Sequence, residues 1–304
     1  MANIFDIDQA RACGLLEQAS VAFGVFDGVH RGHRYLIERA CSASGRASVV
    51  LTFDCDPDEL FAPERLRKLM GNDRRIATLA GSGVDAVVVV PFCEALATQQ
   101  PLDFLDDVFR DAVPASIHVG ADMRFGCKAS GDVAELRRWA QRAGCAVDAV
   151  SLLAVDGEPV TSTRIRRLLA DGSIEQANDL LGYAYTLEGT VVEGRHEGAQ
   201  MGFRTANLEM PAMLQAIGEG VYAAWAHVGD VRCKAAVSVG VTPTFAERAT
   251  ATCEAHLLDF DEDIYGKRIG LEFRHWLRPM RTFDDIGELI ATVMGNIAWV
   301  RENL

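Results

Sequence analysis

Short apolar segments alternate with amphipathic segments over the first 150 residues, and this alternation constrains the fold more than any other feature. The apolar segments are rich in Val and Ile and occupy residues 20–26, 47–53, 84–92, 115–120 and 145–153. Helix-like segments separate them at 33–44, 73–83, 101–112 and 131–144, and two more follow at 162–172 and 173–182. Uniformly apolar strands separated by helices predict a parallel sheet covered on both faces, a doubly wound α/β domain.

A change of pattern near residues 182–185 indicates a second domain. Short β-like segments with tight turns now dominate, and they predict an antiparallel barrel. Gly229 and Asp230 separate two apolar runs and predict a hairpin, while residues 282–303 predict a terminal helix with a Thr or Asp cap. We therefore expect a Rossmann-like domain over residues 1–182 and a β-barrel domain with a C-terminal helix over 183–304.

Composition excludes several classes of protein. The 304 residues suffice for two domains, and the net charge of −13 leaves no cationic excess for non-specific binding of nucleic acid. No apolar run approaches the roughly 20 residues that cross a membrane, and the N-terminus lacks a secretory pattern. Eight cysteines without a CxxC pair favour reduced thiols in a cytoplasmic protein.

The segment GVFDGVHRGH, residues 24–33, brings His30 and His33 together directly after the first apolar segment. A metal site is one interpretation, but no third ligand lies nearby in the sequence. A plain helix start at His33 is another. The third is phosphate binding, because a helix N-terminus presents N–H groups to anions and histidines can donate to a phosphate. This segment alone does not decide between them.

Two later segments favour phosphate chemistry. GADMRFG, residues 120–126, follows a predicted strand and therefore lies at the sheet edge where ligands bind. TSTRIRR, residues 161–167, places hydroxyl groups at a helix start and arginines in its first turns. Ser162, Thr163 and Arg166 would suit a triphosphate, although a solvated, capped helix has the same pattern.

In this order, the three segments resemble the N-terminal module of the bifunctional riboflavin kinase/FMN adenylyltransferases, the bacterial FAD synthetases. MGFRTANL (201–208), GVYAAW (220–225), SVGVTPTF (238–245) and EAHLLDFDEDIYG (254–266) resemble the kinase module, again in order. The resemblance covers nearly the whole chain. It implies that FMN is adenylylated to FAD with ATP, and that riboflavin is phosphorylated to FMN.

The resemblance also implies roles for individual residues. His30 and His33 would stabilise the ATP phosphates during adenylyl transfer, and Glu254 would be the base of the kinase reaction. The other implied ATP-binding residues are Gly24, Phe26, Asp122, Ser162, Thr163, Arg166, Thr205 and Asn207. Thr205 and Asn207 would also hold Mg²⁺, whose preference is for hard oxygen ligands. The implied partners are flavins and ATP, and we expect a monomer or a weak homo-oligomer.

Several positions depart from the family pattern. Ala199 replaces a basic residue, Arg204 a proline and Ser238 an asparagine in the kinase module, which predicts weakened phosphorylation. Cys55 and Asp56 stand where Pro and His are usual, which leaves the adenylyl acceptor open between FMN and an analogue. Two alternatives therefore remain: a nucleotidyltransferase whose kinase-like domain only binds a flavin, and a regulatory protein that binds flavin or nucleotide without turnover.

Overall fold

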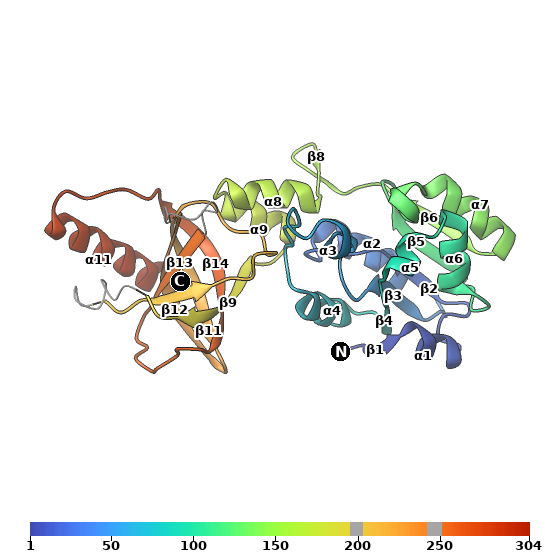
Figure 1. The fold of residues 1–304 in the computed structure, drawn as a ribbon, viewed down its shortest axis with the longest axis horizontal. Coiled ribbons are helices and arrows are strands. Elements are labelled where there is room, and N and C mark those ends of the chain that lie inside the picture. The colour runs from blue at the N-terminus through green and yellow to red at the C-terminus, as the bar shows by residue number, and fades with distance from the viewer. Residues whose placement is uncertain (195–202, 242–250) are drawn as a thin grey trace. The chain divides into compact units, whose positions relative to one another are not determined.

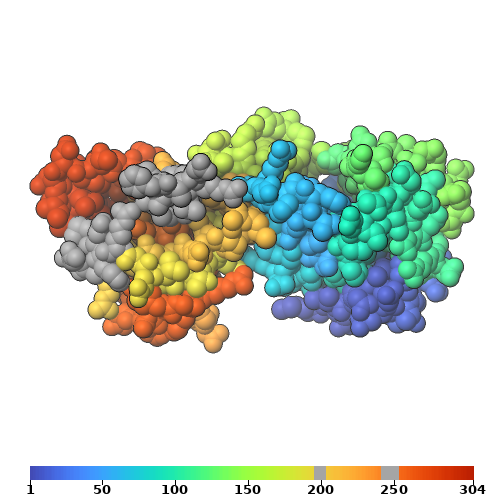
Figure 2. Space-filling view, viewed as in Figure 1, coloured from blue at the N-terminus to red at the C-terminus, as the bar shows by residue number. Residues whose placement is uncertain are grey.

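The computed structural model describes residues 1–194, 203–241 and 251–304 (Figure 1; Figure 2 in space-filling form). The chain forms two compact units, Met1–Ser162 and Thr163–Leu304. Each unit has its own sheet, and each is described by itself below.

The first unit is built on a six-stranded parallel sheet. Its strands are β1 (Asn3–Asp6), β2 (Ser20–Phe23), β3 (Ser48–Phe53), β4 (Ala86–Val90), β5 (Ser116–Gly120) and β6 (Ala146–Val150), in the order β1-β4-β3-β2-β5-β6. The parallel pairing confirms the predicted doubly wound architecture. The sequence pattern missed β1, because this edge strand is mostly exposed and carries no apolar run.

Helices surround this sheet. They are α1 (Ile7–Ala12), α2 (Arg31–Cys41), α3 (Pro57–Phe61), α4 (Asn72–Ala80), α5 (Glu94–Ala97), α6 (Pro101–Phe109) and α7 (Val133–Ala143), with a short 3₁₀ turn at Cys127–Ala129 and a small hairpin of β7 (Ala154–Val155) and β8 (Glu158–Pro159). Helix α2 packs against β2, β3 and β5, while α6 and α7 pack together. The helices α2, α4, α6 and α7 overlap the predicted segments, but α2 begins at Arg31, not at His33.

The strand order identifies the edge at which a ligand binds. From β2 the chain builds outward through β3 to β4, then returns to place β5 and β6 on the other side of β2. The reversal therefore lies between β2 and β5. In open parallel sheets of this type, ligands bind beyond the carboxyl ends of the strands at this point. The segment with His30 follows β2, and the segment with Asp122 follows β5.

The second unit contains a closed antiparallel barrel. Its strands are β9 (Thr186–Val192), β10 (Ala206–Glu209), β11 (Gly220–Val228), β12 (Val231–Val241), β13 (Ala251–Leu257) and β14 (Arg268–Arg278), in the order β10-β13-β12-β11-β14-β9. Val228 pairs with Val231, so Gly229 and Asp230 form the predicted two-residue hairpin loop. The barrel predicted from the β-rich pattern is confirmed.

Within the described residues, helices α8 (Ser162–Ala170), α9 (Ile174–Leu181) and α11 (Ile286–Asn303) accompany the barrel. Helix α8 starts at the junction of the two units, and α9 packs against β14. The terminal helix α11 packs against β12 and is capped by Asp285, which accepts a hydrogen bond from the Glu288 N–H (2.8 Å). Among the described residues, none of the helices combines the length and apolar character that a membrane crossing requires.

Candidate active sites

The loop between β2 and α2 has a strained backbone. Phe26 and Val29 have φ angles of 61° and 39°, in a region that bulky and β-branched residues rarely occupy. Both side chains are buried, which holds the loop in this conformation. Strain of this kind, of order 1–3 kcal/mol per residue, persists where the surrounding structure enforces it, and it is frequent at functional sites.

Packing against the segment before α4 fixes the centre of this loop. Gly28 has a φ of 80°, and a Cβ atom there would lie 2.6 Å from the Leu69 Cδ1 atom, so only glycine fits. The Asp27 carboxylate accepts a hydrogen bond from the Leu69 N–H at 2.9 Å. The loop is therefore shaped before any ligand arrives.

His30 and His33 form a stacked pair at the start of α2. Their ring centroids lie 3.6 Å apart with an interplanar angle of 17°. His30 is the N-cap of α2 and only 4% exposed, and its Nδ1 accepts a hydrogen bond from the His33 N–H at 3.3 Å. This bond leaves the neutral His30 ring with its proton on Nε2. The pair therefore sits at a helix N-terminus, whose partial positive charge attracts phosphate.

His33 is held as a neutral ring. Burial lowers the pKa of His33 well below its usual value, and electrostatic interactions with His30 and Arg75 lower it further. The edge of the His33 ring meets the Phe26 ring, with centroids 5.3 Å apart. The His33 Nδ1 is buried and has no hydrogen-bond partner among the described residues. A buried, unsatisfied ring nitrogen is costly unless a ligand completes it.

The geometry does not favour a metal site at these histidines. The His30 Nδ1 is already engaged as the helix cap. Within the described residues, no group of three or more His, Cys, Asp or Glu side chains is arranged to hold a metal ion. Phosphate binding stays our prediction for this segment, and the position of His30 at a helix N-terminus supports it.

Two other predicted residues, Ser162 and Asp122, belong to the same unit as the histidines. The Ser162 hydroxyl, at the start of α8, donates a hydrogen bond to the Asp27 carbonyl (3.0 Å). Asp122 is exposed and follows β5, the strand beside β2. Thr163 and Arg166 are hydrogen bonded to each other along α8 (3.3 Å) and belong to the second unit. Their position relative to the histidines stays a prediction.

The two predicted residues before the histidines differ in exposure. Gly24 directly follows β2 and is partly exposed, and its N–H donates to the Leu51 carbonyl. The Phe26 side chain is only 2% exposed, so it supports the His33 ring from within the core. Contact of Phe26 with a nucleotide would therefore involve its backbone.

The loop after β3 explains one departure from the family pattern. Asp56 is the N-cap of α3: its carboxylate accepts the Asp58 N–H, and its own N–H donates to Glu59 Oε1 (2.9 Å), a reciprocal capping arrangement. Burial raises the pKa of Asp56 and raises that of the Cys55 thiol to about 11. Asp56 thus has a structural role that a histidine would fill less well.

Sequence reasoning missed two buried cations beside this loop. Lys68 and Arg75 are each 1% exposed. The Lys68 Nζ donates to Glu59 Oε1 and to Asn72 Oδ1, both at 2.5 Å. Arg75 looked like part of an ordinary polar helix face, and only its position four residues before the buried Leu79 was a signal that it faces the core.

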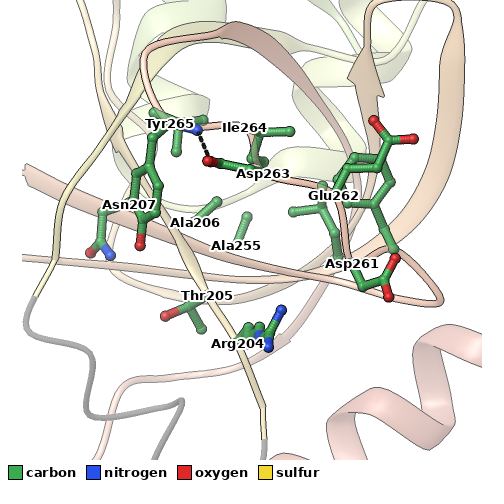
Figure 3. A pocket seen from close by; sticks show the side chains of 13 residues that line it. Arg204, Thr205, Ala206, Asn207, Ala255, Asp261, Glu262, Asp263, Ile264 and Tyr265 are labelled. Carbon is green, nitrogen blue, oxygen red and sulfur yellow. Dashed lines mark hydrogen bonds between the residues drawn. The ribbon is translucent and has the colours of Figure 1, made fainter.

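A cavity of about 340 Å³ opens in the barrel (Figure 3). Arg204, Thr205 and Asn207 line it from the start of β10. The facing residues belong to the segment before β14, which carries three carboxylates: Asp261, Glu262, Asp263, with Ile264 and Tyr265 beyond them. The Asp263 carboxylate accepts the Tyr265 N–H at 3.0 Å and so shapes this segment. The predicted pair Thr205 and Asn207 therefore share a cavity with carboxylates.

Glu254 lies on the strand next to Asn207. Asn207 of β10 and Ser238 of β12 are both register partners of Glu254, so the three positions form a row across neighbouring strands. Glu254 is exposed, but it does not line the cavity itself. The structure thus places Glu254 beside Asn207 in register, without placing its carboxylate in the cavity.

The departures in the kinase module are only partly described. Ala199 lies outside the described residues, as do parts of the 201–208 and 238–245 segments. Arg204 is described: it is exposed, lines the cavity, and its carbonyl accepts a hydrogen bond from His256 Nδ1 (2.8 Å). Its side chain is therefore on the same side as Thr205 and Asn207.

Comparison with known proteins identifies two family domains in this chain. The FAD synthetase family model matches residues 14–164, and the riboflavin kinase family model matches residues 181–304. The bifunctional riboflavin kinase/FMN adenylyltransferase of Pseudomonas fluorescens is 32% identical over 91% of this chain and 90% of its own length. That of Escherichia coli K12 is 31% identical over 94% and 93%.

A solved structure shows the same fold. A Streptococcus pneumoniae protein described as a macrolide-efflux protein has a TM-score of 0.82 and 27% identity, over 94% of this chain and 95% of its own. The similarity to that structure concerns the fold. The two family models and the full-length relatives together place this chain in the bifunctional riboflavin kinase/FMN adenylyltransferase family.

Proposed function

We propose that this protein catalyses two successive steps of FAD biosynthesis, from riboflavin to FMN and from FMN to FAD. The observation that carries the second step is the stacked pair of His30 and His33 at the switch point of the parallel sheet. Membership of the family supports both steps.

In adenylyl transfer, a phosphate oxygen of FMN attacks the α-phosphorus of ATP and pyrophosphate leaves. No covalent enzyme intermediate is required, so catalysis depends on positioning and on donors aimed at the developing charge. The Nε2–H of His30 and the unpaired Nδ1 position of His33 suit this role, since both rings lie at the helix N-terminus. A neutral His33 can donate without the cost of burying a charge.

In riboflavin phosphorylation, the 5′-hydroxyl of the ribityl chain attacks the γ-phosphorus of ATP, and ADP leaves. Glu254 is the proposed base that accepts the hydroxyl proton. The cavity residues Thr205 and Asn207, with the facing carboxylates, offer the hard oxygens that suit Mg²⁺. When bound there with ATP, the ion neutralises charge on the phosphate oxygens. In the adenylyl-transfer site, we expect Mg²⁺ to be held mainly by the phosphates themselves.

We assign adenylyl transfer to residues 1–182 and phosphorylation to residues 183–304. The limits of the two family models, 14–164 and 181–304, support this assignment. The compact units divide earlier, after Ser162, because α9 packs against β14. We further propose that the protein acts on flavins and ATP alone, as a monomer or a weak homo-oligomer.

Chromatography of the flavins tests the function directly. The purified protein is incubated with ATP, Mg²⁺ and either riboflavin or FMN. We expect FMN and FAD from riboflavin, and FAD from FMN. Formation of FAD without phosphorylation of riboflavin would instead support a barrel that only binds a flavin, and no turnover of either substrate would support a regulatory protein.

A further inference from the structure

Arg75 is a buried cation at the ligand-binding edge of the parallel sheet. It lies on α4 and is 1% exposed, and none of the proposed catalytic steps uses it. Burial of a guanidinium is costly unless its donors are hydrogen bonded. The contacts of Arg75 therefore show what this side chain is for.

The Arg75 donors end on neutral acceptors. The Nη1 group donates to the Val25 carbonyl (2.8 Å) and the Thr52 hydroxyl (2.7 Å), and the Nη2 group donates to the Phe53 carbonyl (2.7 Å). Among the described residues, no carboxylate forms an ion pair with Arg75. An ion pair thus does not explain its burial, whereas the three short bonds to the loop after β2 and to the end of β3 do.

These bonds connect the loop after β2 with the end of β3, and the loops that follow these two strands flank the proposed site. Val25 belongs to the loop after β2, which carries His30 and His33. Phe53 ends β3, and the Asp54 carbonyl that follows lies 3.5 Å from the same Nη2. The planar guanidinium spans both loops at once, which a single-point donor cannot do.

A second chain of contacts extends from Arg75 to Asp56. The Arg75 Nη2 lies 3.4 Å from Asn72 Oδ1, and the Asn72 amide donates to Glu59 Oε1 at 2.9 Å. The same Glu59 oxygen accepts the Asp56 N–H. Burial acts to raise the pKa of Glu59, but hydrogen bonds from Lys68, Asp56 and Asn72 outweigh it and lower the pKa, so Glu59 remains an ionised acceptor.

We propose that Arg75 is a positioning residue for adenylyl transfer, which holds the histidine loop and the loop after β3 in one fixed spacing, with Asn72 and Glu59 extending its reach to Asp56. This inference rests on the proposed placement of the ATP phosphates at His30 and His33. Cys55 and Asp56 stand where the family pattern has Pro and His, and these two departures leave the adenylyl acceptor open between FMN and an analogue. Arg75 therefore sets the distance between the nucleotide and the flavin phosphate.

The charge of Arg75 has a second effect on the same site. It is one of three influences that keep the pKa of His33 low, after burial and His30. A buried cation below a phosphate site also favours anions, since buried charges are weakly screened. Variants can separate the effect of the charge from the effect of the hydrogen bonds, because a lysine keeps the charge but lacks the planar guanidinium.

Three variants test the proposal in the full-length protein. Arg75→Gln should lower kcat of FAD formation about 10- to 100-fold, the scale of a misplaced reacting group, and should raise the pKa of His33 in an NMR titration. Arg75→Lys should keep that pKa low, yet still lower kcat about tenfold. Asn72→Ala, at a half-exposed position, should raise KM for FMN about threefold or more while KM for ATP stays unchanged.

Two further variants make the outcomes decisive. Arg65→Gln removes one charge from an exposed nearby position and should leave FAD formation unchanged. His33→Ala tests the proposed site itself. Wild-type kinetics in Arg75→Gln and Asn72→Ala, together with an inactive His33→Ala, would overturn the role of Arg75 and leave the site standing. A fully active His33→Ala would overturn the site. If Arg75→Gln does not fold, the KM result for Asn72→Ala decides.

Discussion

The two candidate ATP sites of this protein differ in how far their groups are fixed before ATP binds. At the sheet edge, strained backbone, a helix N-terminus, a stacked histidine pair and a buried arginine are fixed by hydrogen bonds before ligand binds. In the barrel, the cavity is lined by three carboxylates and by Arg204, whose guanidinium has no hydrogen-bond or ion-pair partner within the described residues. In the first site, the protein itself fixes the groups that would contact phosphate. In the second site, the cavity supplies side-chain oxygens and a cation, and bound ATP and a metal ion would complete the arrangement.

This contrast follows from the groups that each fold provides for binding phosphate. The parallel sheet gathers helix N-termini and loop N–H groups at one edge. An antiparallel barrel has almost no net dipole, so it attracts phosphate through side chains and a bound cation. Substitutions in the first site should therefore affect mainly kcat, and substitutions of cavity-lining residues should affect mainly binding of ATP.

Loss of the proposed base should have the largest effect. We expect Glu254→Ala to lower riboflavin phosphorylation by about 10²- to 10⁴-fold, the contribution of a positioned base, while FMN adenylylation is unchanged. Steady-state assays with each flavin measure both. Glu254 is exposed, so the fold should survive. An unchanged phosphorylation rate would mean that another group takes the proton.

Loss of a histidine should have the next largest effect. We expect His33→Ala to lower kcat of FMN adenylylation by about 10²- to 10³-fold, the scale for one transition-state donor, with little change in KM for ATP. Stoichiometric zinc that binds wild type but not this variant would contradict the phosphate interpretation.

Removal of the cavity cation should have a moderate effect on binding. A charge-assisted phosphate contact contributes about 1.5–3 kcal/mol, so Arg204→Ala should raise KM for ATP in riboflavin phosphorylation at least about tenfold. Adenylyl transfer in the same preparation is the control. An equal change in kcat and an unchanged KM would show that position 204 acts through the backbone that presents Thr205 and Asn207.

The smallest effect concerns stability against pH. The pKa of His33 is lowered in the folded protein, whereas an unfolded histidine titrates near 6.5. As pH falls below about 6.5, the histidine becomes protonated in the unfolded chain but stays neutral in the folded protein. The free energy of unfolding therefore falls by up to about 1.4 kcal/mol per pH unit until the pKa of folded His33 is reached. Urea unfolding at pH 7.5 and 5.5 should show this loss in wild type and about 1 kcal/mol less of it in His33→Asn. Equal losses would contradict the neutral ring.

The predictable part of the fold follows from burial. The apolar runs at β2, β3 and β4 are almost wholly buried strands inside the sheet, and their uniform hydrophobicity reflects this burial. β1 has no such run because it lies at the exposed edge, and β10 was noted only as part of a motif because it has four residues. The start of α2 was placed too late, since a histidine N-cap is not among the usual capping residues.

The part of the site that the sequence predicts consists of residues that lie close together along the chain. His30 and His33 share one loop and helix start, so their proximity was visible in the spacing. Arg75 was not found, because its partners Val25 and Phe53 are far from it in the sequence and only the fold brings them together. Asp56 was taken as a departure from the family pattern, and its capping of α3 became visible only in the structure.

The central claim is that one chain carries two independent active sites linked only by diffusing FMN, and a mixing experiment tests it most directly. With riboflavin, ATP and Mg²⁺, we expect His33→Ala to accumulate FMN without FAD, and Glu254→Ala to leave riboflavin unchanged. An equimolar mixture of the two variants should convert riboflavin to FAD. A mixture that makes no FAD although each variant retains its own activity on the matching flavin, or FAD formation by His33→Ala alone, would contradict this account.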